Sequence, residues 1–210
     1  MADPKLVGLL EKGREAWNDF RNNSEPEPLD LNGVDLRRQD LDRFDLRRVH
    51  LSNANLSEAS LRGALLDRAF ALDVQLNEAD LTGASIHNAT FTTGSCCRTS
   101  FKRVSGSKSS FTNAVLDGAD FSDAALRKAQ FAGASLAHTL FRHAGLVGAV
   151  FWGSQFNATD FSDATFSGTV IGVSDLTHVV GLDRVRHESP SAIDVHSLLR
   201  ARHVRAEEFR

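Results

Sequence analysis

The sequence predicts an all-β solenoid, a chain wound into a coil of short strands, and two observations support this prediction. From residue 31 to residue 176 every fifth position holds Leu, Phe or Ile, and only Ala71, Cys96 and Gly106 fall outside that set. A second series, two positions earlier, holds mostly Ala, Ser, Thr, Gly and Val. A period of five matches neither the 3.6-residue period of a helix nor the alternation of a strand, so a long helix and a flat sheet are both excluded.

The spacing of the two series predicts which side chains point inward. Side chains two positions apart project from the same face of an extended chain. Each five-residue unit therefore points one large and one small side chain inward, and its three other residues, mostly polar, face water and turn a corner. No residue is inserted or lost between 31 and 176, so we expect the large side chains to fill the axis of one continuous coil.

Several units also resemble a known family. The units Ala54–Glu58, Ala79–Gly83 and Ala119–Asp123 are similar to the A(D/N)LXX units of the pentapeptide-repeat family, and the resemblance covers residues 29–178. It implies a right-handed, quadrilateral β-solenoid with four units in each coil, or about 7.5 coils if neighbouring strands stack as in a sheet. At a spacing of roughly 4.8 Å, such a coil is a rod on the order of 36 Å long.

Residues 1–28 are expected to form an N-terminal capping helix and a linker. Asp3 can cap a helix over residues 3–22, and Pro4 suits its first turn. The apolar residues of this helix fall on one stripe, namely Leu6, Leu9, Leu10, Trp17 and Phe20. An uncovered first coil would present an open sheet edge, so we expect the helix to pack over it and to contact Phe44.

Residues 179–210 are expected to form a partly helical C-terminal tail. Ser189 and Pro190 indicate a helix start, with Ile193, Leu198 and Leu199 on its apolar side. The stretch from Gly181 to Ile193 also resembles a segment of bacterial signalling proteins in which pentapeptide coils precede an effector domain, such as a Toll/interleukin-receptor-like domain. That resemblance implies either a sensor-like protein or one whose effector domain has been truncated.

Some apolar residues occupy positions that should face water, and these form a candidate interface. Its members are Phe70, Leu72, Val147, Val150, Trp152 and Val170. Three occupants are open: the C-terminal part of the chain itself, a second copy in a homodimer, or another protein. For Phe70, which neighbours the small Ala71, an inward orientation is a further alternative.

Residues twenty apart would stack into columns about 4.8 Å per step, and two columns are charged. The candidate basic column contains Arg48, Arg68, Lys108 and Lys128. The candidate acidic side contains Asp80, Asp117, Asp120, Asp123, Asp160 and Asp163. For the basic column, neutralisation by neighbouring carboxylates is the alternative to a binding role. For the acidic side, the alternative is that Asp is simply the commonest residue before Leu or Phe in the repeat.

The register weakens between Gly94 and Lys108. There Cys96 and Gly106 occupy positions for large residues, which removes buried methylene groups from the core. We expect a less stable belt at this point, with a kink or a partner site as alternatives.

The composition indicates a cytoplasmic protein. The formal net charge of −3 gives no bulk field that would favour nucleic acid or a membrane. The adjacent Cys96 and Cys97 would point to opposite faces of a strand, so we expect no disulfide between them. The sequence has neither a signal peptide nor a long apolar run.

The sequence does not indicate catalysis. Its eight histidines are scattered, and no Cys or His pair has the spacing of metal ligands. Regular repeats build convex surfaces, whereas catalysis needs a concave site. We therefore expect a protein that is not an enzyme and that uses no cofactor or metal.

The function favoured by the sequence is a non-catalytic scaffold or regulatory module that binds an unidentified protein, or a second copy of itself, through its outer surface. The family resemblance implies one alternative. Some pentapeptide-repeat proteins mimic DNA, occupy a type II topoisomerase (DNA gyrase) and protect against quinolones or toxins, and the candidate acidic side would serve that role. Direct binding of nucleic acid along the basic column is a third hypothesis.

Overall fold

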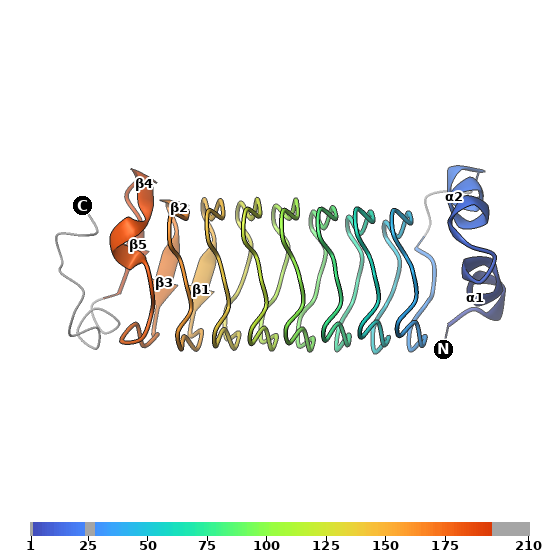
Figure 1. The fold of residues 1–210 in the computed structure, drawn as a ribbon, viewed down its shortest axis with the longest axis horizontal. Coiled ribbons are helices and arrows are strands. Elements are labelled where there is room, and N and C mark those ends of the chain that lie inside the picture. Colours follow the sequence, from blue (N-terminus) through green and yellow to red (C-terminus); the bar gives the residue numbers. More distant parts are fainter. Residues whose placement is uncertain (1, 24–27, 195–210) are drawn as a thin grey trace.

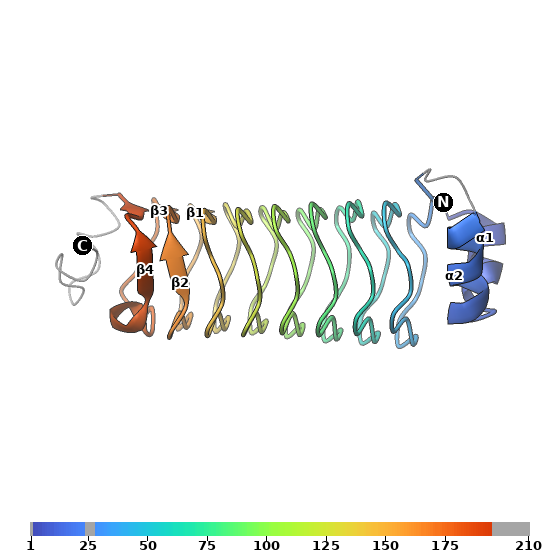
Figure 2. The same ribbon diagram turned by 90° about the horizontal axis from the view of Figure 1, so that it is seen from above.

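The computed structural model describes residues 2–23 and 28–194, and it has the form of a rod of stacked coils with a helical cap at one end (Figure 1). The turned view in Figure 2 shows the same rod, with the two helices at one end and β4 at the other. Within the described ranges, no helix has the length and apolar character needed to cross a membrane. The elements are α1 (Pro4–Leu10), α2 (Arg14–Asn23), β1 (Val150–Trp152), β2 (Thr165–Ser167), β3 (Val170–Gly172), the 3-10 helix η1 (Leu182–Arg184), β4 (Arg186–Ser189) and β5 (Ala192–Ile193).

Each coil of the rod takes twenty residues. Parallel bridges join residues twenty apart, from Asp30↔His50 at one end to Asp160↔Val180 at the other. A coil therefore consists of four five-residue units and has four sides. We number the sides by the large residue of the first coil: Leu31 belongs to side 1, Leu36 to side 2, Leu41 to side 3 and Leu46 to side 4.

The corners between sides are tight turns with a defined geometry. Within a unit, the carbonyl of the large residue accepts a hydrogen bond from the N–H three residues later, as from Ala54 to Leu51 at 3.0 Å. Of the two residues between them, the second, here Asn53, has φ +59°. The third residue of a type II turn requires a positive φ of this kind. Because Arg and Lys occupy many of these positions, the corners project long charged side chains into solvent.

The core confirms the inward direction of both residue series. The large and the small residues are buried along the rod, with few exceptions near the cap. Between Phe101 and Phe161, the phenylalanine rings form one stack on side 1 and another on side 3. Neighbouring rings within each stack have centroids 4.5 to 5.2 Å apart. Rings from sides 1 and 3 meet edge to face across the axis at 5.3 to 5.7 Å. These are favourable aromatic geometries, so the spacing of the strands also sets the spacing of the core.

The kink that the sequence left open as one alternative between Gly94 and Lys108 is absent. The bridges Ser85↔Ser105↔Ala125 continue through the belt without a change of register. A Cβ at Gly106 would lie 2.9 Å from Ile86 Cγ1 and 3.1 Å from Leu126 Cδ2, so these side chains already fill the space that a larger residue would take. The weaker register is therefore a local imperfection of the core, and the coil keeps its course through it.

The N-terminal cap consists of two helices rather than the single helix expected over 3–22. The break falls at Gly13, whose φ of +90° is unfavourable for residues with a Cβ. The Asp3 side chain caps α1 by accepting a hydrogen bond from the Lys5 N–H at 2.9 Å, as predicted. Phe44 is buried and lines the same cleft as Val7 and Leu10 of α1.

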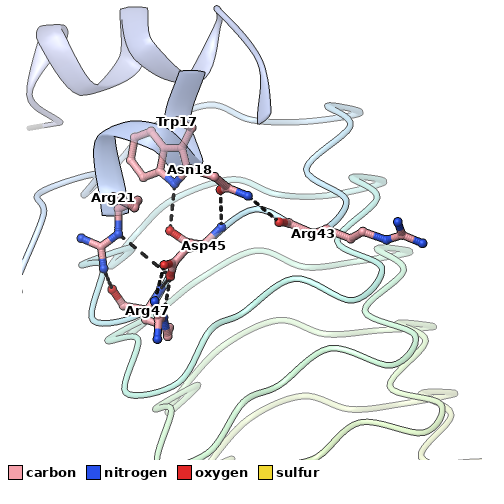
Figure 3. A network of polar contacts seen from close by, with 6 residues as sticks. All are labelled: Trp17, Asn18, Arg21, Arg43, Asp45 and Arg47. Carbon is pink, nitrogen blue, oxygen red and sulfur yellow. Dashed lines mark hydrogen bonds and ion pairs between the residues drawn. The ribbon is translucent and has the colours of Figure 1, made fainter. Parts of the chain in front are cut away.

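Side chains of α2 replace a strand at the edge of the first coil (Figure 3). Trp17 Nε1 donates to the Asp45 carbonyl at 2.8 Å, and Asn18 Oδ1 accepts from the Asp45 N–H at 2.9 Å. Asn18 Nδ2 donates to the Arg43 carbonyl at 3.1 Å, and Arg21 Nη2 donates to the Arg47 carbonyl at 2.7 Å. These backbone groups have no preceding coil to pair with, so α2 satisfies them and covers the edge of side 4.

A buried carboxylate lies at the centre of the same network. Asp45 is 6% exposed and accepts hydrogen bonds from Arg47 Nε at 2.8 Å and Nη2 at 2.6 Å. Burial alone would raise the pKa of Asp45. The hydrogen bonds from the Arg47 side chain and N–H, with the charges of Arg47 and Arg21, outweigh burial and hold this pKa below its usual range.

The C-terminal end differs from the helical tail that the sequence suggested. Ser189 ends β4, which pairs in parallel with β2, and Ile193 belongs to β5, which pairs with β3. The coil therefore continues past residue 178 to at least residue 193. Partners are twenty residues apart at Asp160↔Val180, twenty-one at Thr165↔Arg186 and twenty-two at Val170↔Ala192. The turn after Gly181 therefore inserts one residue, and the register shift within β4 inserts a second. Leu198 and Leu199 lie outside the described residues.

Replacing Phe121 by Ala should cost about 3–5 kcal/mol of unfolding free energy, because a fully buried ring leaves a cavity. The matched control is Phe70→Ala, which removes the same ring from an exposed position and should cost less than about 1 kcal/mol. Urea denaturation of the two variants measures both values. Equal losses would contradict the inward register.

Acid should release the cap from the first coil. The folded-state pKa of Asp45 lies below the usual value for Asp. The stabilisation that the Asp45 carboxylate gives the cap is therefore fully present above about pH 4, and it is lost as the pH falls through the folded-state pKa. In a Trp152→Phe background Trp17 is the remaining tryptophan, so its fluorescence reports on the cap. We expect Asp45→Asn to weaken the cap at neutral pH by about 1–3 kcal/mol and to flatten its acid transition.

The matched control for that experiment is Asp80→Asn, which changes a carboxylate on side 3 away from the cap. This variant should keep the acid transition of Trp17. If Asp45→Asn leaves both the neutral stability of the cap and its acid transition unchanged, the role assigned to the Asp45 network is wrong.

Candidate binding surface

The outer surface of the rod has a regular organisation that follows from the coil. Each unit places one outward residue at the middle of a side, immediately before the large residue, and two at the following corner. Because bridged residues are twenty apart, outward residues form columns along the rod with steps of about 4.8 Å. The three surfaces predicted from the sequence can therefore be located by side and corner.

The C-terminal apolar cluster lies on side 1, over β1 and β3. Trp152 is 53% exposed, and its ring lies over Gly172 on the paired strand, where any Cβ would collide with it. Val150 and Val170 are half-buried beside it. Val173, at the adjoining corner, is 56% exposed and was missed because Val is rare at a corner position; its φ of +53° is unfavourable for a β-branched residue.

Phe70 and Leu72 form a second cluster, separate from the first. Phe70 is 43% exposed, so the inward orientation considered from the sequence is wrong. Its ring contacts His50 of the preceding coil at a centroid distance of 5.8 Å. Thr90 and Ser110, at mid-side positions of side 1, separate the two clusters, and Val147 lies at the corner between sides 4 and 1. The six residues of the candidate interface are thus not one continuous patch.

The exposed Leu65 and Val115 were also missed by the sequence analysis. They are 37% and 39% exposed, at mid-side positions of sides 4 and 2. The signal that could have found them was an apolar residue immediately before the large one, where Asp and Ser are most common.

The candidate acidic side is largely neutralised by basic partners. Asp80, Asp120 and Asp160 lie at mid-side positions of side 3 and form ion pairs with a basic residue eighteen positions earlier. The pairs are Arg62–Asp80 at 3.0 Å, Lys102–Asp120 at 3.1 Å and Arg142–Asp160 at 2.6 Å. Asp163, at the next corner, pairs with Arg184 at 2.5 Å. Positive and negative groups therefore alternate along side 3.

Two members of the acidic side have other surroundings. Asp117 lies at the corner between sides 2 and 3 and accepts hydrogen bonds from Ser135 Oγ at 2.6 Å and the Ala137 N–H at 3.1 Å. Asp123 is exposed at the corner between sides 3 and 4. The six carboxylates thus flank one side but do not form an unbroken negative stripe.

The pKa values on side 3 agree with this pairing. Partial burial acts to raise the pKa of Asp80, Asp120 and Asp160. Hydrogen bonds from the residues two positions later, and the basic partners, outweigh it and lower all three values. These carboxylates are charged at neutral pH and held by local contacts.

The basic column lies at the corner between sides 4 and 1. Arg48, Arg68, Lys108 and Lys128 all have φ between +58° and +61°, and all four are exposed. Within the described part of the chain, Arg68, Lys108 and Lys128 form no ion pair. This surface therefore differs from side 3, where each basic residue faces a carboxylate.

The described residues offer little for catalysis or metal binding. They contain no group of three His, Cys, Asp or Glu residues that could hold a metal ion. Burial raises the pKa of the Cys96 thiol well above its usual range, which makes this group unreactive. A cleft of about 240 Å³ lies where the cap meets the first coil, and it is lined partly by Val7, Leu10, Leu36 and Phe44.

Comparison with solved structures identifies a shared fold. Two trypsin-treated variants of QnrB1, a plasmid-mediated fluoroquinolone resistance protein, are 19% and 18% identical with TM-scores of 0.61 and 0.55. Each alignment covers 82% of this chain, and 84% and 94% of the respective QnrB1 chains. HetL from the cyanobacterium Nostoc, a pentapeptide repeat protein involved in the regulation of heterocyst differentiation, is 21% identical over 88% of this chain and 96% of its own, but its TM-score is 0.41.

The family assignment comes from the sequence profile of the repeat. No curated protein matches the chain. The profile described as pentapeptide repeats matches residues 30–68, 59–93, 107–142 and 134–171, with eight copies. The unmatched gap, 94–106, contains Cys96 and falls where the core register weakens. Because the profile matches well over half of the sequence, the chain belongs to the pentapeptide-repeat family.

Proposed function

We propose that this protein is a non-catalytic scaffold that holds a partner protein against the outer surface of its rod. The observation that supports this proposal most directly is Trp152, which is 53% exposed on the ordered strand β1. A tryptophan exposed to this extent has no role in the core of its own chain. Together with Val150, Val170 and Val173, it forms an apolar surface of the kind that marks an interaction site.

The energetics of interfaces favour a protein as the partner. Large aromatic residues dominate the binding energy of protein interfaces when a partner desolvates them. The Trp152 ring is already held over Gly172, so little side-chain freedom remains to be lost on binding. The coil beneath is fixed by parallel pairing on both sides, Gln130↔Val150↔Val170, and so supplies a rigid base.

A catalytic role has less support in the described structure. Catalysis needs a concave site with groups of perturbed acidity, and the outward residues of this coil stand on flat sides and convex corners. The lowered pKa values of the carboxylates on side 3 are explained by hydrogen bonds from the residues two positions later and by their ion pairs. The cleft at the cap is lined both by apolar residues that attach α1 to the first coil and by the polar Glu11, Asp35, Gln39 and Asp40.

DNA mimicry of the kind that would occupy DNA gyrase is the alternative implied by the family. A mimic needs a run of unpaired negative charges along the rod, because these must replace phosphates. On side 3, Arg62, Lys102 and Arg142 interrupt the carboxylates at alternate coils. This alternation argues against mimicry on that side, and the likeness to QnrB1 concerns the fold alone.

We therefore expect no effect on DNA gyrase. In a supercoiling assay with and without a fluoroquinolone, titration of this protein should change neither the supercoiling rate nor the drug's inhibition. Inhibition or drug rescue that is abolished by Asp120→Asn with Asp123→Asn would contradict this expectation and favour DNA mimicry.

The scaffold proposal is tested by capture from a lysate of the source organism. Trp152→Thr should abolish recovery of a partner that the unaltered protein retains, because corner positions 92 and 112 of the same column already hold Thr and the fold should tolerate it. Quantitative mass spectrometry measures the recovery. If the partner is a second copy of this chain, sedimentation velocity of the purified protein detects the dimer.

The matched control for capture is Val115→Thr, which removes an exposed apolar residue from side 2. This variant should retain the partner. Equal recovery with Trp152→Thr and the unaltered protein would contradict the role assigned to the side 1 cluster.

A further inference from the structure

The corner between sides 4 and 1 carries a concentration of positive charge from residue 48 to residue 128. Arg48, Arg68, Lys108 and Lys128 occupy successive positions of one column, with Asn88 between them, and Arg127 precedes Lys128. We call these five basic residues the basic ridge. The four coil steps from Arg48 to Lys128 make it about 19 Å long.

The ridge is not neutralised in the way that side 3 is. Among the described residues, none of Arg68, Lys108, Arg127 and Lys128 forms an ion pair. The carboxylate on this corner, Asp67, is held by local hydrogen bonds from Ser85 Oγ at 2.6 Å and the His87 N–H at 2.9 Å. The five basic residues of the ridge therefore outnumber Asp67, the one carboxylate that the sequence places on this corner between residues 47 and 128, on a protein whose formal net charge is −3.

Exposed apolar residues flank the ridge at one point. Leu65 is 37% exposed on side 4, and Phe70 is 43% exposed on side 1, so an aliphatic and an aromatic residue flank the corner at Arg68. We call the mid-side residues that flank the ridge on sides 4 and 1 its shoulders. The His50 ring supports Phe70 at 5.8 Å. Further along, the shoulders are small or polar, with Ser85, Ser105 and Ala125 on side 4 and Thr90, Ser110 and Gln130 on side 1.

This combination fits an acidic polypeptide better than a nucleic acid. Proteins that bind single strands stack successive bases on several aromatic rings, whereas the described shoulders of the ridge carry the single pair of His50 and Phe70. Small shoulders beyond Phe70 leave room for a main chain to lie along the ridge. An extended peptide rises about 3.3 Å per residue, so about six residues span it.

We propose that the basic ridge is the docking site for an extended acidic segment of a partner protein, anchored by an apolar side chain between Leu65 and Phe70. The ridge residues pair with carboxylates, and the anchor buries the exposed faces of Leu65 and Phe70. This inference rests on the proposed scaffold function and assigns to it a second surface, whose anchor at Phe70 lies four coils from Val150, and the chemistry of what binds there.

The experiment titrates the full-length protein into a short fluorescein-labelled peptide of alternating Asp and Glu with a central Phe–Leu pair, and measures fluorescence polarisation. We expect saturable binding that weakens steeply between about 50 and 200 mM salt, because ion pairs carry much of it. Phe70→Thr and the double variant Arg68→Gln with Lys108→Gln should each weaken binding about tenfold. A peptide with Ser–Ser at its centre should bind the unaltered protein with the same reduced affinity that the original peptide has for the Phe70→Thr variant.

The matched control is Arg103→Gln. Arg103 is exposed at the corner between sides 3 and 4 and has φ +55°; its substitution is compared with Arg68→Gln alone, because each removes one positive charge. It should leave peptide affinity unchanged. Circular dichroism and urea denaturation verify that each variant is folded.

Three results would overturn the inference: no saturable binding, an equal loss with Arg103→Gln, or tighter binding of an oligothymidine strand than of the peptide. The last result would assign the ridge to nucleic acid. Failure of this titration leaves the capture experiment at Trp152 unaffected, because the anchor at Phe70 lies four coils from Val150, so the two proposals fail separately.

Discussion

The stacking of each coil on the next is the interaction on which the rest of this structure depends. Parallel bridges between residues twenty apart fix the rise of the coil, and that rise, about 4.8 Å, is also a favourable stacking distance for the phenylalanine rings of the core. Backbone pairing and side-chain packing therefore impose the same period. Because both require an unbroken five-residue register, outward residues fall into straight columns, and local sequence decides what each column presents.

The same constraint makes the two ends of the rod special. A stack has no internal means of satisfying its first and last strands. At the N-terminal end, α2 covers one edge through side chains of Trp17, Asn18 and Arg21 that bond to backbone atoms. At the C-terminal end, β4 and β5 add further strands after the turn at Gly181. The charged centre of the cap, Asp45, couples this closure to pH.

Much of the coil could be predicted from the sequence, because its period is local and uninterrupted. The contacts that escaped prediction join distant residues. The Ser189–Pro190 pair is typical of a helix start, but β2 offers an unpaired edge that draws this segment into β4. The single apolar stripe expected over residues 3–22 suggested a single helix. The break at Gly13 depends instead on how α1 and α2 pack on the first coil. Of the candidate surfaces, the acidic side was identified without the ion pairs that neutralise it, whereas Trp152 was correctly identified as outward.

The scaffold account makes one claim above all, that partners bind the outer columns while the core stays unchanged. Hydroxyl-radical footprinting of the protein alone and with its captured partner tests this directly, because it reports the solvent exposure of single side chains. The account predicts that Trp152 or Phe70 becomes protected in the complex, while Phe121 and Phe141 stay unreactive in both states. Unchanged reactivity of both Trp152 and Phe70, with protection confined to the cleft between α1 and the first coil, would contradict it.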